Sequence, residues 1–313
     1  MKLTLIKQDF LYFLYSKKMY IFILLGLILM LAPIFVNWIN LNILTDEVNR
    51  NIVFYYESGF TLEEAFSQGF VYEVLPDGSY LIENPLLFNL ARAQGILDSM
   101  SLQNLMGTIL EFSSASFPFL FGIVGVAFAQ KDLKNNMLKV RGVRFNRENL
   151  LISKSVSLFL ITTMLLLCSF ILAFLTSYLF SSFLKLPFDF PMYQVDNIFY
   201  FSPPNIIQFI FPWLLSLLYS FIGFGLFNVL SNGFAALVII IGYSYIMPNL
   251  GRFSLNNSVS YISNKVFDYN ATIVMLEQYE TNILLSLLVI IFILALSLLS
   301  VLYAWSKKSM YSF

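Results

Sequence analysis

"MYIFILLGLILMLAPIFVNWI", residues 19–39, contains no charged side chain. An α-helix rises about 1.5 Å per residue, so a run of this length covers the roughly 30 Å hydrocarbon core of a bilayer. The run is longer than the apolar core of a cleaved signal peptide, which has about 7 to 15 residues, and no small-x-small cleavage pattern follows it. The sequence therefore predicts that this segment is a retained transmembrane helix.

The rest of the chain has the same character. Of its 313 residues, 58% are hydrophobic and only 12% are charged, whereas soluble domains have about 25% charged residues. Six segments are predicted as spans: residues 19–40, 112–130, 155–183, 206–230, 234–248 and 283–305. The fifth is short and contains Gly242 and Pro248, so we expect it to be tilted or locally unwound. The predicted fold class is an all-α membrane protein with six transmembrane helices.

The distribution of Lys and Arg predicts the orientation of these spans. With a cytoplasmic N-terminus, the inner segments hold 13 of the 18 basic residues but only 3 of the 18 acidic ones, although the net charge of the chain is zero. An even number of spans then returns the basic C-terminal tail, residues 306–313, to the same side. We therefore expect a multi-pass protein of the cell membrane with both termini in the cytoplasm.

Several kinds of chemistry are excluded by residues that the chain lacks. It has no histidine and a single cysteine, Cys168, which rules out an intramolecular disulfide, histidine-dependent hydrolysis and Cys-rich zinc sites. No GxxxxGK[ST] phosphate loop is present, and no charged residue interrupts a predicted span. From the missing residues we expect no catalytic residue, metal or cofactor in this chain. Because ion-coupled carriers place ionisable groups near the bilayer midplane, we expect the energy source to be another protein.

The N-terminal segment, residues 1–18, has the pattern of an amphipathic helix. At about 100° per residue, apolar and polar residues fall on different sides. The expected apolar side holds Leu3, Ile6, Phe10, Phe13 and Leu14, and the polar side holds Lys2, Gln8, Asp9 and Ser16. The favoured interpretation is a helix that lies in the cytoplasmic membrane interface. The alternative is a basic flank that only sets the topology.

The larger predicted cytoplasmic loop, residues 131–154, concentrates positive charge. The stretch "FAQKDLKNNMLKVRGVRFNRENLLISK", residues 128–154, has seven basic and two acidic residues. We expect in it a short helix with one apolar edge, ending near Gly142, and then Asn146 as the N-cap of the helix that enters the third span. Because the other cytoplasmic loop, around Asn232, is very short, this one is expected to dock a partner. The alternative is a positive-inside anchor alone.

These features together resemble the membrane subunit of an ABC-2 type transporter, a family of six-span permeases. The matching elements are "LIKQDFLYFLYSKKMYIFI" before and into the first span, "QKDLKNNMLKVRGVRFNRENLLISK" between spans two and three, and the short basic tail. The resemblance implies a coupling helix that docks on a separate ATPase. The residues implied on or beside that helix are Asp132, Leu133, Met137, Leu138, Lys139 and Arg141, with Arg147 and Lys154 where the chain re-enters the membrane.

The resemblance also implies partners and a direction of transport. The implied partners are two copies of an ABC ATPase subunit, which carry the ATP and Mg, a second permease chain that is identical or a sibling, and the lipid bilayer, with no nucleic acid. Export is the implied direction, and our hypothesis for the cargo is an amphipathic or peptide-like substrate such as an antimicrobial peptide. The alternative is a non-transporting membrane protein, either a sensor or an enzyme that acts on lipid.

Residues 41–111 are predicted to form a small α+β insertion outside the cell, between spans one and two. "TLEE", residues 61–64, fits a capping box, "VYEVLPDGSYLIEN", residues 71–84, fits a hairpin with its turn at Pro76–Gly78, and Pro85 fits the first position of a helix. The predicted acidic surface contains Asp46, Glu47, Glu63, Glu64, Glu73 and Asp77. It either attracts cationic substrates or only keeps a folded cap soluble, and the second interpretation is favoured.

Small and polar residues within the spans have two alternative roles. Gly122, Gly125, Gly223 and Gly225 are expected to permit close helix packing, with a moving gate as the alternative. The candidates for a substrate path are Gln208, Asn228, Phe117, Phe121 and Phe221. For the two amides the alternative is a hydrogen bond to a neighbouring helix, and for the three aromatic residues it is contact with lipid.

Overall fold

The computed structural model of the chain describes residues 2–59, 61–67, 69, 71–74, 80–134, 147–183, 205–247, 250–267 and 279–307. The elements are, in chain order, α1 Lys2–Leu14, α2 Lys17–Glu57, α3 Leu62–Ser67, β1 Val71–Val74, β2 Tyr80–Glu83, α4 Pro85–Ser99, α5 Leu105–Glu111, α6 Ser113–Lys134, α8 Arg147–Phe183, α9 Ile207–Leu230, α10 Gly233–Ile241, η2 Gly242–Ile246, α11 Leu255–Val266 and α12 Ile283–Lys307. All are α-helices or β-strands except η2, a short π-helix.

Five helices in the described part of the chain are long and apolar enough to cross a membrane. They are α2, α6, α8, α9 and α12. The molecule is therefore an all-α membrane protein, as predicted. The fifth predicted span corresponds to the shorter apolar helix Gly233–Ile246, which at 1.5 Å per residue extends about 21 Å. Its backbone changes to a π-helix at Gly242, a residue where the sequence predicted local unwinding.

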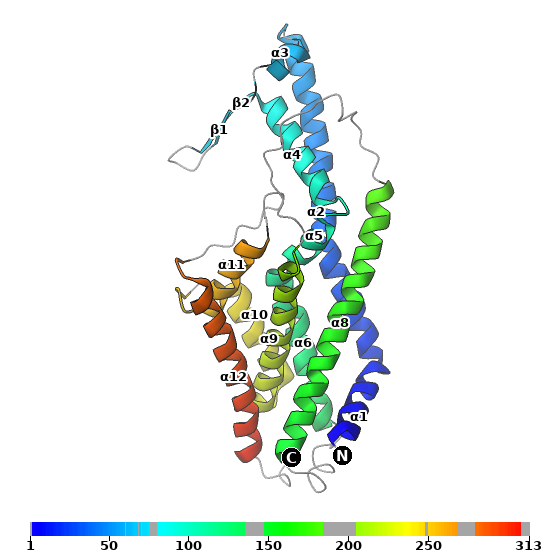
Figure 1. Cartoon of the computed structure of the whole chain (residues 1–313), viewed down its shortest axis with the longest axis vertical. Helices are drawn as coiled ribbons and strands as arrows, with labels where there is room; N and C mark the ends of the chain where they lie inside the picture. Colours follow the sequence, from blue (N-terminus) through cyan, green and yellow to red (C-terminus); the bar gives the residue numbers. More distant parts are fainter. Residues whose placement is uncertain are drawn as a thin grey trace.

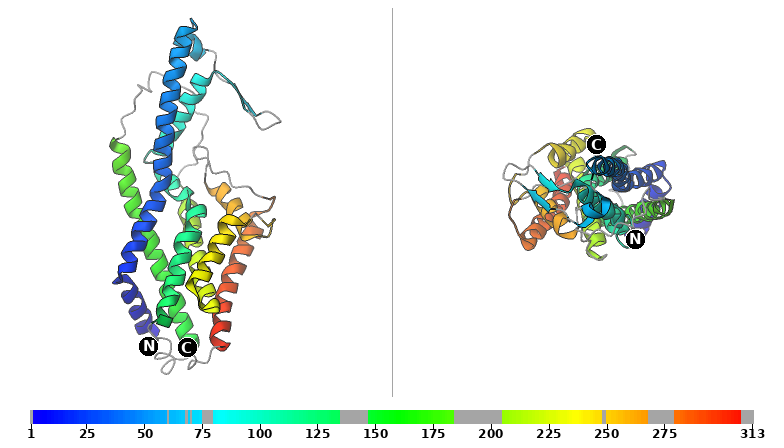
Figure 2. Two further views of the ribbon diagram at one scale, coloured as in Figure 1. Left: turned by 180° about the vertical axis from the view of Figure 1, so that it is seen from behind. Right: turned by 90° about the horizontal axis from the view of Figure 1, so that it is seen from above.

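The long helices lie side by side along the long axis of the molecule (Figure 1). α6 packs against α9, α12 and α10 flank α9, α2 pairs with α8, and α1 packs on α8. α1, the end of α6, the start of α8 and the end of α12 lie together at one end, seen from two further sides in Figure 2. We call this the loop end, because α6 finishes and α8 begins there.

Two glycines allow α6 and α9 to approach closely. A Cβ atom added at Gly125 of α6 would lie 2.0 Å from the carbonyl oxygen of Ser220 in α9. A Cβ atom at Gly223 of α9 would lie 2.3 Å from the carbonyl oxygen of Gly122 in α6. Since real Cβ atoms do not come so near to backbone, only glycine fits at these two positions. The predicted packing role is thereby confirmed for them.

α2 is longer than the span predicted within it. It continues without interruption for 41 residues, which is about 60 Å or twice the hydrocarbon thickness. The helix therefore passes from the predicted span directly into the charged segment that follows, and the membrane boundary at residue 40 stays a prediction. The helix ends at Ser58 and Gly59, where Gly59 has a φ of 79°, a conformation that favours glycine.

The far half of α2, from Leu41 to Glu57, forms with α3 and α4 a projection that we call the stalk (Figure 1). It has a hydrophobic core of its own, made by Val48, Ala65, Leu86, Leu87 and Leu90. Asn84 joins its three helices. Its side chain accepts from Tyr55 Oη at 3.2 Å and from Leu87 N at 3.3 Å, and donates to the carbonyl oxygen of Ala65 at 2.6 Å.

Local signals within residues 41–111 predicted several features that the structure contains. Thr61 N donates to Glu64 Oε2 at 2.9 Å and Glu64 N donates to Thr61 Oγ1 at 3.3 Å, which confirms the capping box. β1 and β2 pair antiparallel from Val71 with Glu83 to Val74 with Tyr80. Pro85 opens α4. The turn predicted at Pro76–Gly78 lies outside the described residues.

Candidate functional site

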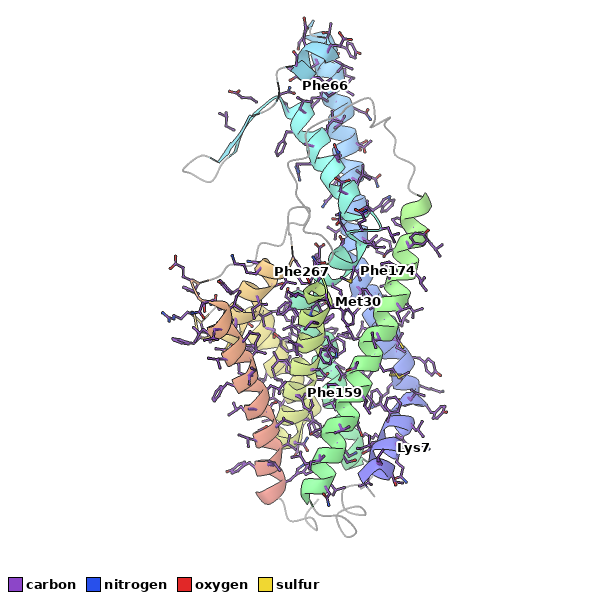
Figure 3. All side chains as sticks on the ribbon, in the orientation of Figure 1. Lys7, Met30, Phe66, Phe159, Phe174 and Phe267 are labelled. Carbon is purple, nitrogen blue, oxygen red and sulfur yellow. The ribbon has the colours of Figure 1, made fainter. Side chains whose placement is uncertain are left out.

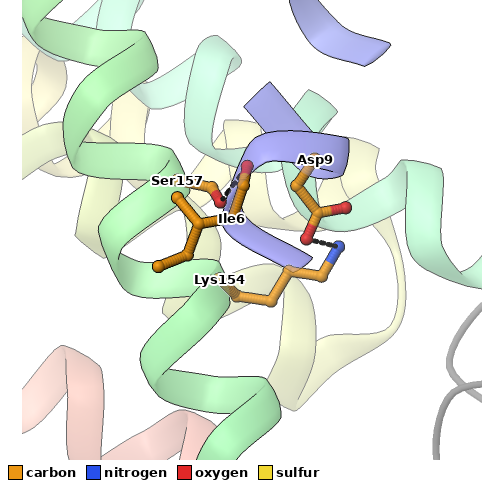
Figure 4. Close-up of polar contacts among 4 residues, drawn as sticks. All are labelled: Ile6, Asp9, Lys154 and Ser157. Atoms are coloured by element: carbon orange, nitrogen blue, oxygen red, sulfur yellow. Dashed lines mark hydrogen bonds and ion pairs between the residues drawn. The ribbon is translucent and has the colours of Figure 1, made fainter. Parts of the chain in front are cut away.

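The candidate site lies at the loop end, where α1 contacts α8 beside the end of α6. Asp9 of α1 and Lys154 of α8 form an ion pair there, with Asp9 Oδ2 at 3.0 Å from Lys154 Nζ (Figure 4). Both side chains are only 1% exposed. Next to the pair, Ser157 Oγ donates to the carbonyl oxygen of Ile6 at 3.4 Å, so α8 holds α1 through two polar contacts one helical turn apart.

The buried stripe of α1 differs from the predicted one. Leu5, Asp9 and Phe13 are buried at four-residue spacing, which places them on one face of the helix. Asp9 was predicted on the polar side, and this is wrong, because Lys154 supplies a buried partner of opposite charge. Leu3, predicted on the apolar side, is 80% exposed.

Two further contacts bring α6 to the same place, one with α1 and one with α8. Lys131 Nζ lies 3.5 Å from the centre of the Tyr12 ring, and Lys154 Nζ lies 5.3 Å from the centre of the Phe128 ring. Both distances are within the range of cation–π attraction, about 6 Å. We call Asp9, Tyr12, Lys131 and Lys154 the α1 clamp, since they fasten the N-terminal helix to the two helices on either side of residues 135–146.

The predicted coupling residues fall at this site only in part. α6 remains helical to Lys134, so Asp132 and Leu133 belong to its last turn and not to a loop that starts at residue 131. α8 is already helical from Arg147, ahead of the predicted span. The other predicted coupling residues and the predicted N-cap lie outside the described residues; they are Met137, Leu138, Lys139, Arg141 and Asn146.

The predicted substrate-path amides are tied to neighbouring helices in this conformation. Asn228 donates to the carbonyl oxygen of Phe224 at 2.8 Å and accepts from Trp305 Nε1 at 2.8 Å, linking α9 to α12. Gln208 donates to the carbonyl oxygen of Val266 at 3.4 Å, linking α9 to α11. The two amides lie 20 positions apart on α9, or about 30 Å, so they do not form one group.

The three aromatic candidates are packed in the interhelical core. Phe117 is 1% exposed, Phe121 is 0% exposed and Phe221 is 8% exposed. The rings of Phe117 and Phe121 meet edge to face, with their centres 4.8 Å apart, an arrangement that stabilises aromatic pairs. All three therefore contact protein in this conformation, and their place in a substrate path stays a prediction.

The predicted acidic surface is partly described. Asp46, Glu63 and Glu64 are exposed on the stalk and Glu47 is half-buried. The pKa of Glu64 is lowered, first by the backbone N–H of Thr61 and then by its hydroxyl. The side chain of Glu73 and all of Asp77 lie outside the described residues. In the part of the chain that is described, no three His, Cys, Asp or Glu side chains come together as a metal site.

The buried ion pair was missed from the sequence, although one signal pointed to it. Asp9 is the only acidic residue before Asp46, and it lies four residues from apolar residues on either side, at Leu5 and Phe13. A lone carboxylate at the centre of an apolar stripe needs a partner of opposite charge. Lys154 is 145 positions away in the chain, so only the packing of α1 on α8 identifies it.

Comparison with family models, with curated proteins and with solved structures gives no match. The class of the molecule is therefore defined by its fold, an all-α membrane protein with five helices long enough to span a bilayer in its described part. Its site is defined by the α1 clamp, which fixes an N-terminal helix to the helices that bracket residues 135–146.

Proposed function

We propose that this chain is the membrane-spanning permease subunit of an ATP-driven ABC exporter. One observation carries the proposal: the α1 clamp ties the helix before the first span to both α6 and α8, the helices that bracket the predicted coupling loop. A displacement of that loop by an ATPase would reach α1 and α6 together with α8. Contacts between packed helices with two arrangements are what such coupling requires.

The remaining parts of the proposal follow from the same architecture. The helix Gly233–Ile246 serves as the sixth span, with its π-helical end near the opposite face. The loop end and both termini face the cytoplasm, and the stalk is the extracellular insertion. Two such permease chains, identical or siblings, work with two ATPase subunits that hold ATP and Mg. The cargo is an amphipathic or peptide-like molecule, whose approach the exposed acidic residues of the stalk assist if it is cationic.

Affinity purification of the full chain from its native membrane in mild detergent, followed by mass spectrometry, tests this function. We expect a nucleotide-binding ATPase to accompany the wild-type chain and to be lost from Leu133→Asp/Leu138→Asp. The matched control is Thr4→Asp/Gln8→Asp, which adds the same charge at exposed positions of α1 at the same end and should keep the ATPase. Recovery of equal amounts of ATPase with both variants would show that the loop does not dock the ATPase.

A second candidate function is a membrane sensor, and the length of α2 favours it. One unbroken helix of 41 residues joins the stalk to α1, which lies at the loop end, so a ligand on the stalk would act on the cytoplasmic side through these two helices. In the same purification, a signalling protein in place of an ATPase would support the sensor and contradict the exporter.

A further inference from the structure

We propose that the corner between α1 and α2 is a binding site for the anionic headgroups of phospholipids. We call this surface the basic corner, and it consists of Lys7, Lys17 and Lys18 with Tyr12, Tyr15 and Tyr20. Chain direction changes at Ser16, which has an extended backbone and whose Oγ donates to the carbonyl oxygen of Phe13 at 2.6 Å. The inference depends on the membrane class of the protein and does not depend on transport.

The basic corner combines exposed charge with exposed aromatic rings. Lys7, Lys17 and Lys18 are all exposed, and Figure 3 shows Lys7 on α1 at the loop end of the molecule. Tyr15 is 76% exposed and Tyr20 is 67% exposed. Such rings with a polar tip favour the level of the lipid headgroups, where one part meets hydrocarbon and the other meets water. The start of the first span therefore lies at headgroup depth.

The α1 clamp gives this surface a single sign of charge. Asp9, the one acidic residue before Asp46, points into α8 and is 1% exposed in its pair with Lys154. Among the described residues, no acidic side chain forms an ion pair with any lysine of the basic corner. Lys131 packs behind this surface, with Nζ 3.5 Å from the centre of the Tyr12 ring.

These observations identify the ligand as phosphate carried by lipid. Lysine is a compact positive charge that binds phosphate oxygens, and basic residues that flank a membrane helix attract anionic lipids by about fivefold each. A bilayer presents many phosphates in one plane, which suits lysines on two helices that both begin at the interface. Binding there would hold the outer face of α1 while Lys154 holds its inner face.

Native mass spectrometry of the purified full-length chain tests the proposal, with phosphatidylglycerol or phosphatidylcholine added as the probe. We expect the wild-type chain to bind phosphatidylglycerol more tightly than phosphatidylcholine. Lys7→Gln/Lys17→Gln/Lys18→Gln should reduce the affinity for phosphatidylglycerol by at least about tenfold and leave the affinity for phosphatidylcholine unchanged. High salt should reduce the wild-type preference, because the attraction is electrostatic and surface-exposed.

The matched control is Arg50→Gln/Arg252→Gln/Lys265→Gln, which removes the same number of charges from exposed side chains of the stalk, of the turn before α11 and of α11. This variant should keep the preference for phosphatidylglycerol. Equal loss in both variants would show a general effect of net charge and would overturn the proposal. It would also be overturned if the lysine variant bound phosphatidylglycerol as tightly as the wild type. That conclusion would hold even if the variant had lost binding to an acidic protein.

Discussion

Asp9 and Lys154 hold α1 in place by an interaction from which water is excluded. Their charged atoms are 3.0 Å apart and both side chains are 1% exposed. A buried ion pair adds little net stability compared with apolar residues, but removing one partner leaves a buried charge poorly compensated. We therefore infer that the pair specifies where α1 docks more than it strengthens the fold.

Substitution of either partner should destabilise the molecule. For Asp9→Asn we expect a loss of about 3 kcal/mol, because breaking a buried pair costs about 3–5 kcal/mol. Thermal unfolding of the detergent-solubilised chain measures this. Lys7→Gln, on the exposed side of the same helix, is the control and should unfold like the wild type. The exchanged pair Asp9→Lys/Lys154→Asp should recover part of the loss, and a double variant as unstable as the sum of the single ones would contradict a direct pair.

Gly125 tests the close packing of α6 and α9. A Cβ atom there would meet the carbonyl oxygen of Ser220 at 2.0 Å, and backbone cannot give way as a side chain can. Gly125→Ala should therefore push the helices apart at a cost of about 1–3 kcal/mol, the usual range for overpacking. At Gly242 a Cβ atom would meet nothing within 4 Å, so Gly242→Ala should have no such cost. Equal melting temperatures for the two variants would show that α6 and α9 do not pack as described.

At the scale of elements, local signals predicted the starts of helices better than their faces and lengths. The capping box at Thr61 and Glu64 and the start of α4 at Pro85 depend on neighbours within four residues, and both were predicted. The end of α2 was missed because the apolar run stops near residue 40 while the helix stop, Gly59, stands much later. Charged residues after the apolar run continue a helix as well as apolar ones do.

The helix α3 should loosen in acid through Glu64. The N–H and hydroxyl of Thr61 lower the pKa of this carboxyl, so the ionised form stabilises the first turn. This stabilisation is complete above the ordinary carboxyl pKa, about 4.3, and is lost as the pH falls through the lowered value in the folded protein. Hydrogen exchange of α3, corrected for intrinsic rates, should show protection a few-fold weaker at pH 3 than at pH 6.

Two alanine variants separate this capping interaction from general acid effects. Glu64→Ala should weaken protection of α3 at pH 6 and abolish its dependence on pH. Glu63→Ala changes the adjacent exposed carboxylate, which makes no capping contact, and should behave like the wild type. If both variants kept the wild-type dependence, the cap would have no part in the stability of α3.

At the scale of the whole molecule, the sequence predicted the membrane class because about 20 consecutive apolar residues have few other structural solutions. The site was harder to predict, since it depends on contacts between segments far apart in the chain. Asp9 with Lys154, and Gly125 with Ser220, become neighbours only when α1 packs on α8 and α6 packs on α9. The predicted path residues Gln208 and Asn228 show the same limit, because their partners are on other helices.

The sidedness of the molecule follows from the proposed topology and can be measured directly. α1 and the far end of the stalk lie at opposite ends of the long axis (Figure 1). In a Cys168→Ser background, which has no other cysteine, Glu57→Cys should react with a membrane-impermeant thiol reagent in intact cells. Lys7→Cys should react only after permeabilisation. Both replaced side chains are exposed, so protection of either one reports the membrane and not burial.

The proposed roles of the loop end and of the stalk depend on which side of the membrane each one lies. A cytoplasmic loop end is required for an ATPase to reach α6 and α8, since ATP is cytoplasmic, and an outer stalk is required for its acidic side chains to meet an extracellular ligand. Glu280→Cys, at an exposed position just before α12, tests the stalk side independently. Like Glu57→Cys, it should react with the impermeant reagent in intact cells. Labelling of Lys7→Cys in intact cells, with protection of the other two, would show that the orientation is the reverse of the proposed one. This result would exclude both the exporter and the sensor in the form proposed.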